Sequence, residues 1–92
     1  LFLIRPDYLP NEEKQKIVLS FAKSIRQFCP EIYVSAPDMY MAEEEMRIIA
    51  EELGNKSCTG KPSDLGGIPH GLGSTGFGVF HATLVACEHL GL

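Results

Sequence analysis

The fold that the sequence predicts depends on the stretch Glu31-Ile32-Tyr33-Val34-Ser35-Ala36-Pro37-Asp38. Its first five residues alternate in side-chain character, with Ile32 and Val34 on one face, which predicts a short strand. Pro37 restricts the residue before it to extended backbone and ends that strand. Asp38 is therefore predicted to lie just past the carboxyl end of a strand, which is the edge where α/β sheets bind ligands.

Upstream of this stretch the sequence predicts another strand and a helix. Residues 1–4 form a short apolar run stopped by Pro6, which predicts a first, buried strand. Asn11 is a favourable N-cap for a helix that Pro30 ends. One face of that helix carries apolar residues at helical spacing, namely Val18, Phe21, Ala22, Ile25 and Phe28. Strand, helix and strand form a βαβ unit, so we expect an α/β fold with a small open sheet and three helices.

Downstream of Asp38 the pattern predicts the other two helices. The second should bury Ala42, Met46, Ile49, Ala50 and Leu53. Gly54 would supply its left-handed C-cap, and the acidic run 43–45 in its first turn is interpreted as a solvated face. Residues 55–73 are expected to form a loop, and a third helix begins at Ser74 or Thr75. Because the third helix is apolar nearly all round, we expect it to be buried on more than one side.

Length and composition limit the possible functions. The 92 residues make at most one small domain, residues 1–92, with an ordinary apolar share of 45%. The net charge of −4, with 8 scattered basic residues against 12 acidic ones, argues against nucleic-acid binding. No apolar run approaches the roughly 18 residues of a membrane span. Three widely spaced cysteines favour a reducing cytoplasm over a disulfide framework, and the cysteines and histidines have no metal-ligand spacing.

Asp38 is the first candidate for a functional residue. A carboxylate at a strand end can act as a general acid or base, shuttling a proton to and from a substrate. The alternative is that Asp38 is a turn residue or a helix N-cap, both of which are common uses of aspartate.

The glycine-rich segment is the second candidate. Its residues Gly71-Leu72-Gly73-Ser74-Thr75-Gly76 match the pattern G-x-G-x-x-G. The pattern indicates dinucleotide binding only after a strand, and Pro69 argues against a strand here. We expect a tight glycine turn that opens a helix and brings its N-terminus near a ligand, or simply close helix packing. Lys61 lacks the frame of a P-loop and is interpreted as a solvated loop lysine.

Four motifs in order give the chain a resemblance that covers nearly its whole length. They are Ala36-Pro37-Asp38-Met39, Thr59-Gly60-Lys61-Pro62, Gly66-Gly67 and Ser74-Thr75-Gly76 with Gly78-Val79. In this order and spacing they resemble the glutamate/leucine/phenylalanine/valine dehydrogenase family, and its glutamate branch most.

The resemblance implies a place in a larger enzyme. The chain would be a partial domain, the carboxyl half of the substrate-side and oligomerisation domain, ending in the helix that leads to the cofactor domain. Such enzymes form homo-oligomers and interconvert an amino acid and its 2-oxo acid with NAD or NADP, releasing ammonia. Asp38 matches the catalytic aspartate, Ala36 matches a backbone contact to the substrate amino group, and Thr75 matches a threonine near the nicotinamide.

The sequence departs from the family pattern at two positions. Gly71, at a substrate-binding position, and Phe77 stand where many glutamate dehydrogenases carry arginines, which leaves the substrate side chain open. The family's catalytic lysine would precede Leu1 and its dinucleotide fingerprint would follow Leu92. We therefore expect the isolated 92 residues to be inactive. The alternatives are a non-catalytic oligomerisation module, a related protein without activity, or a small independent nucleotide-binding domain.

Overall fold

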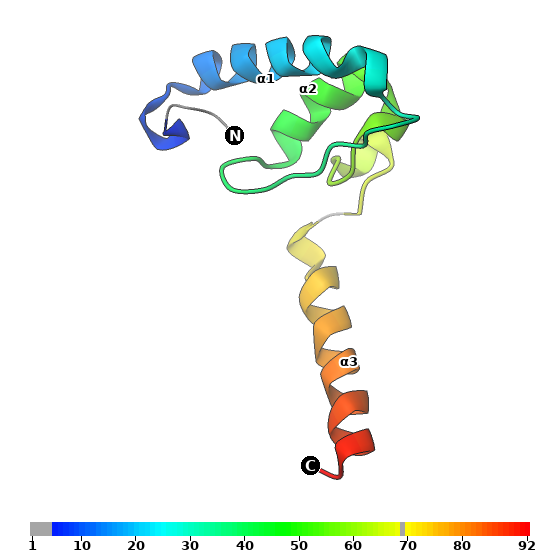
Figure 1. Ribbon diagram of the computed structural model, residues 1–92. Helices are drawn as coiled ribbons and strands as arrows, with labels where there is room; N and C mark the ends of the chain where they lie inside the picture. The colour runs from blue at the N-terminus through cyan, green and yellow to red at the C-terminus, as the bar shows by residue number, and fades with distance from the viewer. Residues whose placement is uncertain (1–4, 69) are drawn as a thin grey trace.

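The computed structural model describes residues 5–68 and 70–92, and over these ranges the chain is helical (Figure 1). Its α-helices are α1 (Asn11–Ile25), α2 (Glu43–Leu53) and α3 (Ser74–Leu90). Short 3-10 helices lie between them, namely η1 (Pro6–Tyr8), η2 (Arg26–Phe28), η3 (Asn55–Ser57), η4 (Ser63–Leu65) and η5 (His70–Leu72). The three predicted helices are confirmed, but no strand or sheet forms among the described residues, so the α/β prediction is wrong.

The predicted strand over residues 31–35 fails because almost none of it finds a partner. The amides of Ile32 and Tyr33 both donate to the Phe28 carbonyl, at 2.8 and 2.9 Å, and so close a turn. Only Ser35 pairs with another segment, in a single parallel bridge to Cys58. Ile32 is 79% exposed, so its alternating side chain meets no sheet neighbour that would stabilise a strand. The other predicted strand, residues 1–4, lies outside the described residues.

The core forms where α1 and α2 lie side by side (Figure 1). Its buried apolar residues are Val18, Ala22, Met46, Ile49, Ala50 and Cys58. The predicted inward face of α2 is thus largely confirmed, although Ala42 is exposed. The predicted stripe of α1 is only partly right, because Phe21 and Phe28 are 37% and 43% exposed. A core this small gives only marginal stability.

Two predicted helix ends differ in detail from the structure. Asn11 is the first residue of α1 and follows Pro10, and its side chain makes no cap hydrogen bond. Gly54 does end α2, with its N–H donating to the Ala50 carbonyl at 2.8 Å. Its φ of 97° requires glycine, but its ψ of 155° is not left-handed helical as predicted.

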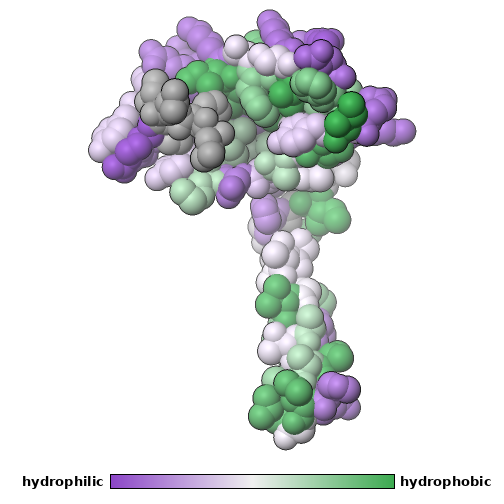
Figure 2. All heavy atoms as spheres, in the orientation of Figure 1, coloured by the Kyte–Doolittle hydropathy of each residue, from purple (hydrophilic) through white to green (hydrophobic). Residues whose placement is uncertain are grey.

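Helix α3 projects away from α1 and α2 (Figure 1). All of its residues are exposed except Cys87, which is half-buried, so the prediction that it is buried on more than one side is wrong here. Hydrophobic residues lie along its length in Figure 2, and Phe77, Phe80 and Val85 are 57–66% exposed. The radius of gyration is 16.5 Å, whereas a compact chain of this length has about 12 Å. No described helix is both long and apolar enough to span a bilayer.

Candidate functional site

Three of the four sequence motifs lie close together, and two of them directly follow the bridged residues Ser35 and Cys58. The Ser35 N–H donates to the Ser57 carbonyl at 2.9 Å, and the Thr59 N–H donates to the Ser35 carbonyl at 2.8 Å. Ser35 and Cys58 are 3% and 2% exposed, so these bonds are shielded from water. The bridge therefore joins the segment that carries Asp38 to the segment that begins the Thr-Gly-Lys-Pro motif.

A second contact between the same two segments requires a glycine. A Cβ atom on Gly60 would lie 2.5 Å from Cγ of Pro37, and Gly60 has a φ of 66°. Both the close approach and the left-handed backbone exclude a side chain here. Pro37, next to Asp38, therefore packs directly on the backbone of Gly60.

The Gly-Gly motif packs against the Thr-Gly-Lys-Pro motif. A Cβ atom on Gly67 would lie 1.6 Å from the carbonyl oxygen of Lys61, and the Gly67 N–H donates to the Pro62 carbonyl at 3.1 Å. The Lys61 ammonium donates to the Cys58 carbonyl at 2.6 Å. Lys61 is therefore partly buried and holds this loop together, which corrects its interpretation as a solvated lysine.

Asp38 lies at the start of a tight turn that directly follows Pro37. Its carbonyl accepts the Met41 N–H at 2.9 Å, and Tyr40 in the turn has a φ of 62°. Asp38 does not follow a strand, but its carboxylate is exposed and accepts no hydrogen bond from the described residues. The neighbouring Ala36 is exposed as well. The turn thus presents a carboxylate that a ligand can reach.

An ion pair between a partly buried lysine and a buried glutamate contacts this turn. The Lys14 ammonium of α1 lies 2.7 Å from Oε1 of Glu45 and donates to the Tyr40 carbonyl at 3.2 Å. The other carboxylate oxygen of Glu45 accepts the Ala42 N–H at 2.8 Å. Glu45 is only 5% exposed, so the interpretation of residues 43–45 as a solvated face is wrong for Glu45. Its place three residues after Ala42, in the N-terminal turn of a helix, was the signal for this bond.

The pKa of Glu45 reflects these contacts. Burial is the largest single effect and opposes the charged form, but the hydrogen bonds from Lys14, the Ala42 N–H and the Glu45 N–H, with the charge of Lys14, together outweigh it. The pKa of Glu45 is therefore lowered from its ordinary value, and the carboxylate is charged at neutral pH.

Gly71 and Thr75 belong to a separate part of the molecule. Gly71 lies in η5 and Thr75 in the first turn of α3, and both are exposed. Gly73 between them has a φ of 70° and directly precedes α3, which confirms the predicted glycine turn that opens a helix. Among residues 5–68 and 70–92, no hydrogen bond or ion pair joins Gly71 or Thr75 to Asp38 or Ala36. The structure therefore groups the four candidate residues as two pairs.

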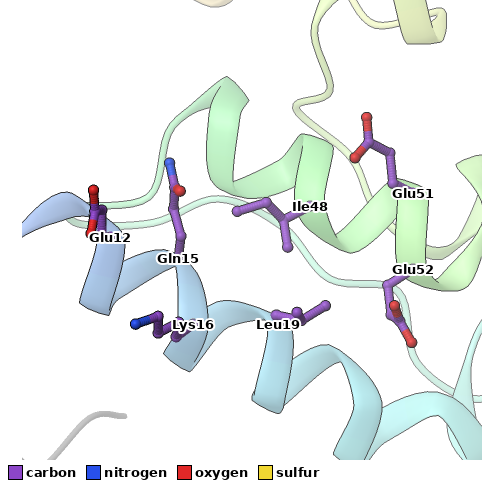
Figure 3. A pocket seen from close by; sticks show the side chains of 7 residues that line it. All are labelled: Glu12, Gln15, Lys16, Leu19, Ile48, Glu51 and Glu52. Atoms are coloured by element: carbon purple, nitrogen blue, oxygen red, sulfur yellow. The ribbon is translucent and has the colours of Figure 1, made fainter.

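An open groove of about 510 Å³ lies elsewhere, between α1 and α2 (Figure 3). Its lining residues are Glu12, Gln15, Lys16, Leu19, Ile48, Glu51 and Glu52. The groove contains none of the predicted site residues. Glu52 in its wall is paired with Arg26, which neutralises part of the acidic charge.

The described residues offer no cluster of metal ligands and no activated thiol. No group of three or more histidine, cysteine or acidic side chains is placed to hold a metal ion there. All three cysteines are free. Burial raises the pKa of the Cys58 thiol against the opposing charge of Lys61, so this thiol stays protonated at neutral pH and is a poor nucleophile.

Comparison with models of protein families and with curated proteins finds no match to this chain.

Proposed function

We propose that this chain is the Asp38-bearing segment of an NAD(P)-dependent amino-acid dehydrogenase. The observation that carries the proposal is the convergence of three motifs, in which Gly60 and Gly67 pack so closely that side chains are excluded. These motifs resemble those of the dehydrogenase family in their order along the chain. Their contact in space supports the view that they form one structural unit.

Asp38 has the chemistry that the reaction needs. Oxidative deamination converts an L-amino acid and water into a 2-oxo acid and ammonium, while a hydride passes to the nicotinamide. A carboxylate near the substrate nitrogen takes up and returns protons during these steps. The exposed Asp38 carboxylate accepts no hydrogen bond from any described residue, so it is accessible for that role. The Ala36 carbonyl, two residues away, would bind the substrate amino group.

The described residues fit only a small part of a dinucleotide site. The glycine turn opens α3 without a preceding strand, so the described ranges lack the usual pyrophosphate fold. Thr75, whose exposed hydroxyl makes no hydrogen bond to a described residue, is the candidate contact to the nicotinamide. We therefore propose that the 92 residues alone neither turn over amino acids nor bind NAD or NADP tightly.

The motifs and Gly71 bear on the substrate side chain in opposite ways. We propose glutamate as the first candidate because the Gly-Lys-Pro and Gly-Gly motifs resemble the glutamate branch. Gly71, however, offers no cation to a γ-carboxylate. We also propose a cytoplasmic location, which the three free cysteines support.

A substrate screen tests this proposal. The complete protein that contains this chain is expressed, and reduction of NAD or NADP is followed at 340 nm with single L-amino acids. The proposal predicts turnover of one amino acid, with release of ammonium and the matching 2-oxo acid. Gly71→Arg should lower the KM for glutamate relative to leucine. A screen in which no amino acid supports reduction of either cofactor contradicts the proposal.

A second candidate function is assembly without catalysis. It is favoured by α3, whose apolar side chains are exposed along the helix (Figure 2). Sedimentation of the 92-residue chain would show a homo-oligomer that Phe80→Glu disperses. This candidate would be excluded if the 92-residue chain is monomeric and the complete protein has dehydrogenase activity.

A further inference from the structure

Lys14 connects α1 to a turn that is 26 residues away in the sequence. Its ammonium lies 2.7 Å from Oε1 of Glu45 and 3.2 Å from the Tyr40 carbonyl. Glu45 in turn accepts the Ala42 N–H at 2.8 Å. The two side chains therefore hold the backbone on both sides of Met41.

The turn that they hold is a strained one. Tyr40 is the non-glycine residue with positive φ, 62°, among the described residues. Such a conformation is unfavourable for a residue other than glycine and persists only where surrounding contacts enforce it. The Lys14 ammonium binds the carbonyl of this same residue. The Met41 N–H then bonds back to the Asp38 carbonyl at 2.9 Å, which completes a path from α1 to Asp38.

We propose that Lys14 is a positioning residue, which fixes the 38–42 turn so that Asp38 presents its carboxylate to the substrate amine. This inference rests on the proposed dehydrogenase function. Lys14 does not itself contact substrate, because its ammonium is engaged by Glu45 and the Tyr40 carbonyl. A misplacement of about 1 Å in a catalytic group can cost roughly 100-fold in rate, so the hold on this turn matters.

The burial of the pair distinguishes it from an ordinary surface ion pair. The side chains of Lys14 and Glu45 are 19% and 7% exposed. Removing one partner leaves the other charge buried without compensation, which releases the turn instead of leaving it unchanged. The ion pair between Arg47 and Asp64 offers a contrast, because the Asp64 side chain is 59% exposed.

The first test measures the turn directly, in the 92-residue chain. Lys14→Met keeps the aliphatic length and removes the charge, and Lys16→Met is the matched control on an exposed position of α1. We expect hydrogen exchange at the amides of Met41 and Ala42 to accelerate at least 10-fold in Lys14→Met and to stay unchanged in Lys16→Met. Equal acceleration at all protected amides of α1 would show only global destabilisation and would overturn the assignment, as would unchanged exchange at the turn.

The second test measures catalysis in the complete protein. We expect Lys14→Met to lower kcat by about 10- to 100-fold with less than a threefold change in the KM for the amino acid. Lys14→Arg, which retains the charge, should recover most of the loss. A reduction of kcat that Lys14→Arg does not relieve, or a kcat equal to that of the Lys16→Met control, overturns the positioning role.

The two tests separate this inference from the function on which it rests. Faster exchange at the turn in Lys14→Met, in a protein without dehydrogenase activity, supports the hold on the turn and overturns the proposed function. Normal exchange and normal kcat in Lys14→Met, in a protein that Asp38→Asn inactivates, supports the function and overturns the positioning role.

Discussion

Replacing Gly67 by alanine tests the packing that supports the Asp38 turn. The new Cβ would lie 1.6 Å from the Lys61 carbonyl oxygen, while real Cβ contacts stay beyond 3.0 Å. One of the two backbones must therefore move by about 1.4 Å, the difference between these two distances. That movement breaks the 3.1 Å hydrogen bond from the Gly67 N–H to the Pro62 carbonyl.

The size of the effect follows from these two losses. The hydrogen bond contributes about 1 kcal/mol, and overpacking costs roughly 1–3 kcal/mol, so we expect the free energy of unfolding to fall by about 2–4 kcal/mol. With a urea dependence of about 1–1.5 kcal/mol per M for so small a chain, the midpoint should fall by roughly 2 M. Circular dichroism at 222 nm is the suitable probe, because the chain is helical and contains no tryptophan.

Two other glycines serve as controls for the Gly67→Ala variant. A Cβ on Gly71 meets nothing within 4 Å, so Gly71→Ala should stay within about 0.5 kcal/mol of the wild type. Gly66 also has open space but a φ of 80°, so Gly66→Ala should cost about 1–2 kcal/mol from backbone strain alone. If Gly67→Ala proves as stable as Gly71→Ala, the packing of the Gly-Gly motif on Lys61 is refuted.

Four further predictions concern stability. Met46 is fully buried, so Met46→Ala should lower the free energy of unfolding by about 2–5 kcal/mol and Met46→Leu by less than about 1.5 kcal/mol in urea titrations. Since folding lowers the pKa of Glu45, its stabilising effect is present above the unfolded pKa of about 4.3 and is lost as pH falls through the folded value. The midpoint temperature of thermal unfolding should therefore decrease once the pH falls below about 4, and this decrease should be less steep in Lys14→Met. The hydroxyl of Ser35 is buried without a described hydrogen-bond partner, so Ser35→Ala should raise the free energy of unfolding by about 1 kcal/mol. A decrease in stability would instead indicate that a bound water satisfies this hydroxyl. Gly78 lies in the exposed helix α3 with open space around it, so Gly78→Ala should increase helicity by far-UV circular dichroism and slow amide exchange in α3.

The helices could be predicted from the sequence because their signals are local. The apolar spacing around Val18 and Ala22 favours a helix over the residues that carry it. The glycine after Leu53 likewise ends the helix at its own position. The strands could not be predicted in the same way. The alternation of Ile32 and Val34 predicts a strand only if a partner pairs with it, and among the described residues only Ser35 finds one.

The candidate site shows the same division between local and distant signals. The turn at Asp38 and the glycine turn before α3 could be read from prolines and glycines. The hold of Lys14 on Glu45 could not, because it joins two helices that only tertiary packing brings together. The exposure of α3 was equally hidden, since an apolar helix predicts burial without saying what covers it.

The most direct test of the central claim is the turnover of Asp38→Asn in the complete protein, with the amino acid that the substrate screen identifies. Asparagine keeps the shape of the side chain and removes its basicity. The account predicts that kcat falls by about 10²- to 10⁴-fold while the folded stability stays within about 0.5 kcal/mol, because the Asp38 side chain is exposed. A kcat within about threefold of the wild type would contradict the assignment of Asp38 as the proton-transferring residue.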